Sequence, residues 1–217
     1  MDVDGYLRRF IDLDYRLPNP PRADFCASLS ERFNLLDLFR NRQRGAEELA
    51  EFLNAFSSLS EIFKLSLRSI ELCFAQLNIV FRTTPSNKVL FANLVAFLIA
   101  LRARNLPLYD ALTKGTSDLD AGLSYIKGLP GGTEYVDSYD GIEIEALHAI
   151  RRGTRMDSTV GEAPYRNALD RHSNDSPEWK RADDILKAMT MLYRQNAYDA
   201  LPLCIRRIEL AEHFNIL

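Results

Sequence analysis

Two arginines at opposite ends of one apolar helical segment have the chemistry to bind an anion. Arg68 falls in the first turn of a helix that opens Ser66-Leu-Arg-Ser-Ile-Glu, and Arg82 falls near the end of the same segment. A cation in a first helical turn opposes the helix dipole, so its presence there indicates an anionic partner. Spacing alone also allows a surface arginine paired with Glu61 or Glu71. Arg68 and Arg82 are therefore candidate anion ligands, with the surface ion pair as the alternative.

The other motifs that could hold a phosphate or a metal ion are incomplete. The glycine-rich loop Gly128-Leu-Pro-Gly-Gly-Thr lacks the lysine that a phosphate-binding P-loop needs, and it predicts a flexible turn. His148, His172 and His213 each stand without a second ligand four residues further on, so we expect no zinc site.

Charged pairs and clusters elsewhere favour solvated surfaces. The acids Glu143 and Glu145, and likewise Asp183 and Asp184, predict exposed helix faces rather than acid–base pairs.

Two basic clusters could contact nucleic acid phosphates: Arg40-Asn-Arg42-Gln-Arg44 and Arg151-Arg152-Gly153-Thr-Arg155. A formal charge of −3 and a pI near 5.7 argue against a strongly basic clamp. The chain also lacks the aromatic signature of an RNA-recognition motif. Nucleic acid is therefore not the expected partner.

The composition is that of a soluble globular protein. Of the 217 residues, 47% are hydrophobic and 26% charged, which excludes a disordered chain. The three cysteines, Cys26, Cys73 and Cys204, form no CxxC pair and predict buried thiols in a reducing compartment. The most apolar stretch, 89–101, is shorter than the roughly 20 residues of a membrane span. We expect a cytoplasmic protein without a transmembrane segment.

Most of the chain has helical periodicity, which predicts a mainly α, multi-helix bundle. Helices are expected from the Pro20-Pro21 entry to about Phe33 and at 46–63, from the Ser66 cap onwards, from an Asn87 cap to Arg104, from the Ser176 cap to Arg194, and at 198–213.

One short segment near the N-terminus has the period of a strand instead. Leu13, Tyr15 and Leu17 alternate with polar residues, and Pro18 ends the run. A lone strand leaves its backbone polar groups without partners. This orphan strand therefore needs a sheet that the rest of the sequence does not predict.

Glycine usage divides the chain. Eight of the ten glycines lie between residues 114 and 161. We expect one unit over residues 1–113, a glycine-rich linker or excursion over 114–140, and a C-terminal helical region over 141–217.

The N-terminal half resembles the C-terminal part of the KAP-family P-loop NTPases. Three segments carry the resemblance: Asp4-Gly-Tyr-Leu-Arg-Arg-Phe-Ile-Asp-Leu-Asp-Tyr-Arg-Leu-Pro, Ser66-Leu-Arg-Ser-Ile-Glu and Leu77-Asn-Ile-Val-Phe-Arg-Thr-Thr-Pro. In that family a parallel sheet holds the nucleotide-binding lysine and acids, a strand like Leu13–Leu17 closes the sheet, and a helical region follows. The resemblance covers about residues 1–113 and would explain the orphan strand as the last strand of a P-loop core that is missing here.

This sequence departs from the family in having neither GxxxxGK[ST] nor a hydrophobic strand that ends in paired acids. Met1 falls just before the last core strand, as in a split or truncated gene. The resemblance therefore implies a lid-like regulatory region that does not hydrolyse ATP alone. ATP and magnesium would belong to the intact parent family. Arg68, and less so Arg82, would reach the γ-phosphate of ATP bound to a P-loop core in trans.

Two other functions stay open at this point. The chain could be a free-standing helical module for protein–protein interaction that never meets a nucleotide. It could also be a DNA-binding adaptor that uses Arg151, Arg152 and Arg155, whose affinity would fall steeply with salt.

Overall fold

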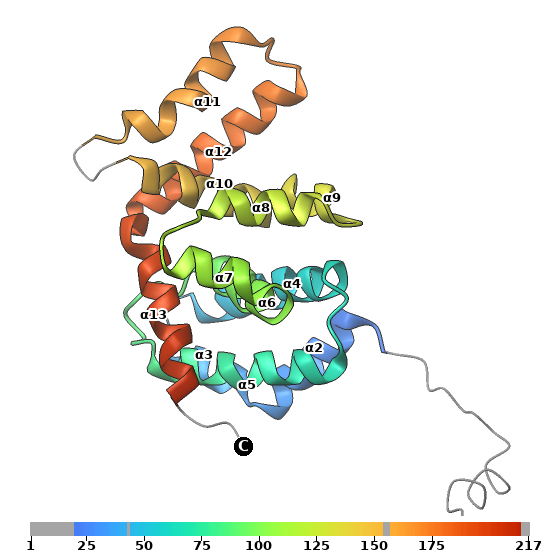
Figure 1. Ribbon diagram of the computed structural model, residues 1–217. Coiled ribbons are helices and arrows are strands. Elements are labelled where there is room, and N and C mark those ends of the chain that lie inside the picture. Colours follow the sequence, from blue (N-terminus) through green and yellow to red (C-terminus); the bar gives the residue numbers. More distant parts are fainter. Residues whose placement is uncertain (1–19, 43, 154–156, 214–217) are drawn as a thin grey trace, which may run out of the picture.

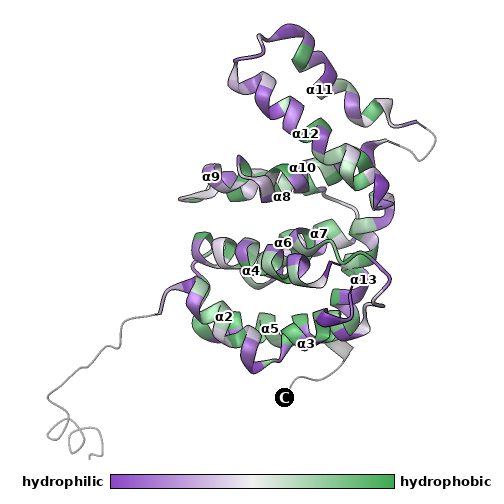
Figure 2. Cartoon of the chain, turned by 180° about the vertical axis from the view of Figure 1, so that it is seen from behind, coloured by the Kyte–Doolittle hydropathy of each residue, from purple (hydrophilic) through white to green (hydrophobic). Residues whose placement is uncertain are grey.

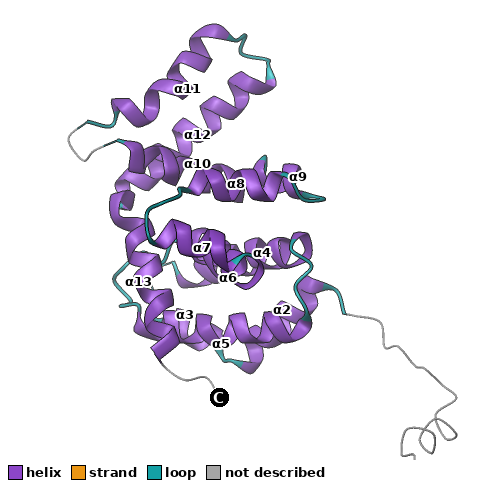
Figure 3. Cartoon of the chain, viewed as in Figure 1, coloured by secondary structure: helices purple, strands orange, loops and turns teal. Residues whose placement is uncertain are grey.

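A helix that is apolar on every side lies at the centre of the molecule, and the other helices are arranged around it (Figure 1). The computed structural model describes residues 20–42, 44–153 and 157–213. Within these ranges the chain forms twelve α-helices and one 3-10 turn and no strand (Figure 3), which confirms the mainly α class. The predicted strand Leu13–Leu17 lies outside the described residues.

The elements follow one another in this order: α2 (Arg22–Arg32), α3 (Leu35–Arg40), α4 (Gly45–Ile62), α5 (Leu67–Thr83), α6 (Ala92–Arg104), α7 (Leu106–Thr113), α8 (Leu119–Lys127), α9 (Gly132–Val136), α10 (Tyr139–Arg152), α11 (Thr159–Arg171), α12 (Pro177–Arg194), η1 (Ala197–Asp199) and α13 (Ala200–His213).

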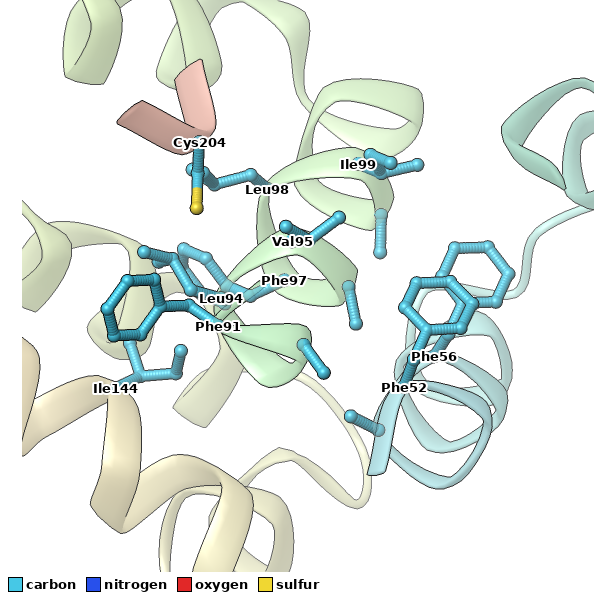
Figure 4. Packing of buried hydrophobic residues seen from close by; sticks show 14 of the residues in the cluster. Phe52, Phe56, Phe91, Leu94, Val95, Phe97, Leu98, Ile99, Ile144 and Cys204 are labelled. Carbon is cyan, nitrogen blue, oxygen red and sulfur yellow. The ribbon is translucent and has the colours of Figure 1, made fainter. Parts of the chain in front are cut away.

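The central helix is α6. Every residue from 92 to 101 is buried, and helices α4, α5, α7, α10 and α13 all pack against it. Figure 4 shows its side chains pointing in several directions, with Phe52 and Phe56 of α4 beside one face and Ile144 and Cys204 near another. A helix that is apolar all round is stable in water only when it is enclosed in this way. No described helix is both long and apolar enough to cross a membrane.

A cluster of aromatic rings joins α4 to α5 and α3. Phe52 and Phe56 stack with their ring centroids 5.4 Å apart, and Phe74 meets both of them edge-on. Phe81 packs edge-on against Phe39 at 4.6 Å. Edge-to-face geometry is the favourable one for rings in contact, so these pairs fix how α3, α4 and α5 sit against one another.

Most of the predicted helix boundaries agree with the structure. The hydroxyl of Ser66 accepts a hydrogen bond from the backbone N–H of Ser69 at 3.0 Å, and the hydroxyl of Ser176 accepts one from Trp179 at 3.1 Å. Asn105 ends α6 and caps α7. The predictions for these helix starts rested on local capping rules, and local rules suffice here.

The Asn87 cap is wrong, because α6 begins five residues later. Phe91 precedes the helix in a left-handed conformation, with φ of 53°. The loop before it is held by distant groups: the Lys88 carbonyl accepts a hydrogen bond from Arg42 at 2.6 Å, and the Leu90 N–H donates to Glu48 at 3.4 Å. These tertiary contacts keep the loop out of the helix that the sequence favours.

Residues 114–140, for which the glycine content predicts a linker or an excursion, contain α8 and α9. Leu119, Leu123 and Ile126 of this segment are buried in the core. Gly122 packs so closely on α6 that a Cβ there would lie 2.6 Å from the ring of Phe97. The segment is therefore packed rather than exposed along its length. The loop around Gly131, with φ of 78°, forms the predicted turn. The division of the chain at 113 and 140 stays a prediction.

The last helices build a more polar end and then return to the core. α10, α11 and α12 pack on one another, and Figure 2 colours much of α11 and α12 hydrophilic. α13 then packs on α5 and α6.

The three cysteines are buried, as expected, and burial raises the pKa of Cys26 to about 11 and of Cys73 and Cys204 to about 12.

A buried ion pair ties the start of α4 to the loop before α6. Arg42 donates to Glu48 at 2.6 Å, and their side chains are only 5% and 8% exposed. Arg42 also donates to the carbonyl groups of Thr84, Pro85 and Lys88. Each charge is desolvated, so each depends on its partner.

We expect Arg42→Ala to lower the free energy of unfolding by about 3–5 kcal/mol, because the Glu48 charge would stay buried without its partner. Arg40→Ala is the matched control: its exposed pair with Asp37 contributes at most about 1 kcal/mol. Urea unfolding of both variants measures the difference. Equal, small losses would mean that the buried pair does not hold this loop.

Candidate functional site

Arg68 lies where its sequence position predicts, in the first turn of α5, with its side chain 74% exposed. Its Nη1 contacts one carboxylate oxygen of Glu71 at 3.0 Å. The other oxygen of Glu71 accepts from Nη1 of Arg32 at 2.7 Å. The bonds from Arg68 and Arg32 lower the pKa of Glu71. One carboxylate therefore holds two exposed guanidinium groups side by side, and we call this the Arg32–Glu71–Arg68 cluster.

Arg32 is the member of the cluster that sequence reasoning missed. It ends α2, 39 residues before Glu71, and no spacing rule links the two positions. They meet because α2 packs on α5. The Arg68–Glu71 pair, in contrast, joins two residues three positions apart on one helix. It is the surface ion pair that the sequence spacing allows as the alternative to an anion ligand.

Arg82 does not join the cluster. It lies on α5 fourteen residues after Arg68, which is about 21 Å along a helix. Its Nε donates to the side-chain carbonyl of Asn78 at 3.0 Å, and the residue is exposed. Both arginines face solvent, but they are too far apart to contact one phosphate.

The arginines of segment 40–44 are already paired with carboxylates and are not available to bind phosphate. Arg40 pairs with Asp37, Arg42 is buried against Glu48, and Arg44 pairs with Glu47 and Glu51 at 2.8 and 3.0 Å. Each of these arginines is thus neutralised by a carboxylate. Arg151 and Arg152 are exposed in the last turn of α10, and Thr154 and Arg155 of the second basic cluster lie outside the described residues.

Glu143 and Glu145 do not form the solvated helix face that their spacing predicts. Glu143 accepts a hydrogen bond from the amide of Asn93, a fully buried residue of α6, at 2.8 Å. Glu145 accepts hydrogen bonds from Arg181 of α12 and Tyr165 of α11. α10 is covered by α6 on one side and by α11 and α12 on another, so both acids are drawn into contacts between helices.

Acid groups gather where α4 faces the start of α10. Burial raises the pKa of Glu143 to about 7, against the hydrogen bond from Asn93, which lowers it. Burial and the nearby Glu51 raise the pKa of Asp140 to about 6. Burial also raises the pKa of Glu51, although Arg44 acts in the opposite direction. These carboxylates therefore favour their neutral forms more than exposed ones do.

The described residues bring no three His, Cys, Asp or Glu side chains into an arrangement that could hold a metal ion.

Comparison with protein-family models, with curated proteins and with solved structures finds no match to this chain. The candidate sites among the described residues are therefore the Arg32–Glu71–Arg68 cluster and the acid groups between α4 and α10.

The Glu143 carboxyl should make stability depend on pH. Its pKa in the folded protein, about 7, lies above the ordinary value of 4.5, so the unfolded chain loses this proton first as pH rises. The free energy of unfolding therefore falls between about pH 4.5 and 7 and stays lower above that range. Glu143→Gln keeps an acceptor for Asn93 without the charge. It should raise stability at pH 7.5 by about 2–3 kcal/mol relative to the wild type, with little gain at pH 4.5.

Urea unfolding at pH 4.5 and 7.5 makes this comparison, with the exposed Glu178→Gln as the control that should leave the pH dependence unchanged. Asp140 titrates in an overlapping range and should keep part of the slope in Glu143→Gln. An identical slope in the wild type and Glu143→Gln would contradict the assignment.

Proposed function

We propose that this protein is a helical regulatory region that acts on a nucleotide-binding partner in trans, as its resemblance to the KAP-family P-loop NTPases implies. The observation that supports the proposal is the Arg32–Glu71–Arg68 cluster at the start of α5. In this role the chain does not hydrolyse ATP alone. ATP and magnesium are held by the partner's P-loop core, and this chain supplies cationic groups to the phosphate.

The cluster has the charge and shape that phosphate recognition needs. Two guanidinium groups surround a single carboxylate, which leaves one net positive charge, and their side chains are 67% and 74% exposed. Guanidinium groups present paired N–H donors that match phosphate oxygens. Glu71 restricts both side chains before any ligand arrives, which reduces the entropy that binding would cost.

Arg68 and Arg82 cannot have the same role, because they lie at opposite ends of α5. Arg68 stands at the N-terminal end of α5, where the helix dipole also favours an anion, and Arg82 stands about 21 Å away at the other end. Only one of them can touch the γ-phosphate of a given ATP. We assign that contact to Arg68, with Arg32 beside it, and place Arg82 at the edge of the same partner surface.

The test is an ATPase assay of the P-loop core, taken as the product of the reading frame directly upstream, with and without this chain. Wild-type chain should change the hydrolysis rate, and Arg68→Ala should reduce that change at least about tenfold, in line with arginines that contact a transferred phosphate. Arg206→Ala, an exposed arginine of α13, is the matched control and should behave as the wild type.

Equal rates with the wild type and Arg68→Ala would remove the phosphate role of the cluster. An upstream product without a nucleotide-binding lysine and magnesium-binding acids would remove the KAP-type assignment altogether.

A free-standing interaction module is the second candidate, and one feature favours it. Leu72 and Leu106 are 43% and 51% exposed and line an open groove of about 270 Å³ between α5 and the α6–α7 corner. Exposed leucines beside a groove are typical of protein-binding surfaces. Under this candidate, Leu72→Glu would weaken binding of a partner while Arg68→Ala and the removal of ATP would not.

A further inference from the structure

Asn93 and Glu143 form a polar contact between α6 and α10. Asn93 has no exposed surface, and its Nδ2 donates to Oε2 of Glu143 at 2.8 Å. The other polar atom of the same amide, Oδ1, is buried and has no hydrogen-bond partner among the described residues. A buried acceptor without a partner costs roughly 1–3 kcal/mol of free energy. The Asn93 amide therefore lacks one donor at the place where it meets a carboxyl group.

A protonated carboxyl group supplies that donor. An ionised carboxylate only accepts hydrogen bonds, whereas the neutral acid also carries one O–H. When an amide and a carboxylic acid lie in one plane, the amide N–H donates to one carboxyl oxygen and the acid O–H donates to the amide oxygen. The neutral Glu143 acid can thus donate to Oδ1 of Asn93 while it accepts from Nδ2. In this state both polar atoms of the Asn93 amide have a partner.

The charged groups around Glu143 also favour its neutral form. Glu51 of α4 and Asp140 of α10 act on it with like charge, and Arg44, directly before α4, acts in the opposite direction. Arg44 is already paired with Glu47 and Glu51. A negative charge on Glu143 therefore meets more repulsion than attraction.

A cavity of about 30 Å³ beside Glu143 gives water a place to enter. This volume is enough for one or two water molecules. α4 contributes Glu48 and Glu51 to the lining, and Tyr139 of α10 lies there too. The neighbouring side chains of α12 and of the residue after it are uncharged: Ala188, Met191, Leu192 and Gln195.

α9 faces the same acids with a neutral group. Tyr135 of α9 is buried, and burial first, then Asp140 and Glu143, raise the pKa of its hydroxyl. Neither α9 nor α12 therefore brings a positive charge to Glu143 from these positions. The proton is what neutralises Glu143 where α10 meets α6.

We propose that Asn93 and Glu143 form a proton-operated latch that holds α10 against α6. Loss of the proton leaves Oδ1 of Asn93 without a donor and adds a negative charge beside Glu51 and Asp140. α8, α9, α11 and α12 all pack on α10, so the latch also sets how this part of the chain is held on the central helix. The latch does not depend on the function proposed above, because α2 and α5 take no part in it.

The direction of the pH dependence follows from the raised pKa of Glu143, about 7. A group that binds its proton more tightly in the closed state stabilises that state below its pKa, and the stabilisation is lost as pH rises through it. The latch is therefore closed in mildly acidic solution and loosens above about pH 7.

Amide hydrogen exchange of the full chain at pH 5.5 and 8, corrected for the intrinsic exchange rate at each pH, tests the latch. The protection of α10 should fall at least about tenfold more than that of α5. In Glu143→Gln the new amide carries no charge and can donate to Oδ1, so most of this fall should disappear, with a smaller part left from Asp140. Glu178→Gln, an exposed position on α12, is the control and should keep the wild-type fall.

An equal fall in α5 and α10 would mean that ionisation lowers global stability without releasing α10, and would overturn the proposal. The same fall in the wild type and Glu143→Gln would overturn it as well. Crystal structures at pH 5.5 and 8 test the donor. Oδ1 of Asn93 should lie about 2.5–3.0 Å from a Glu143 oxygen at pH 5.5, because two acceptors approach so closely only with a proton between them, and farther away at pH 8. A separation above about 3.5 Å at pH 5.5 would exclude the acid–amide pair.

Discussion

The burial of α6 on all sides is the constraint on which the rest of the structure depends. An apolar helix has no solvent-facing side of its own, so α4, α5, α7, α10 and α13 together must supply the enclosure. Fully burying a leucine, phenylalanine or isoleucine side chain contributes about 1.5–3 kcal/mol, and α6 carries a run of them. The energy of this one helix therefore outweighs that of any surface ion pair. It also explains why Gly122 is needed where α8 passes over Phe97.

Burial on all sides also dictates where polar groups must go. Asn93 is the one polar residue in the buried run 92–101, and its amide needs a partner inside the protein. Glu143 of α10 supplies an acceptor, which brings a carboxylate into a poorly solvated position and raises its pKa. Arg42 and Glu48 likewise supply hydrogen-bond partners to the backbone of the loop that leads into α6. Arg42 donates to the Lys88 carbonyl, and Glu48 accepts from the Leu90 N–H. The charges between α4 and α10 thus follow from the way in which α6 is enclosed.

Local sequence rules predict the elements of this fold but not the contacts between them. Sequence spacing is enough to predict the caps Ser66 and Ser176 and the Arg68–Glu71 pair. In each case the two partners lie three residues apart. Arg32 meets Glu71 across 39 residues, and Asn93 meets Glu143 across 50, distances at which spacing carries no information.

The errors have the same origin. Asn87 satisfies the local rule for a helix cap, but Arg42 and Glu48 hold the loop after it and delay the helix to Ala92. The spacing of Glu143 and Glu145 is that of a solvated face, but α6 from earlier in the chain covers Glu143, and α11 and α12 from later in the chain cover Glu145. In both cases tertiary packing overrides a weak local preference.

Helix α4 lies between two surfaces of opposite charge. α2 packs on it from one side and α9 from the other, and Figure 1 shows α2 and α5 on one side of it and α8, α9 and α10 on the other. The Arg32–Glu71–Arg68 cluster belongs to the first side, and a groove lined by Glu61, Glu134 and Asp140 belongs to the second. Because the two surfaces share no residue, substitutions in one should act independently of those in the other. That independence allows phosphate recognition by the cluster to be tested without disturbing the acidic side of α4.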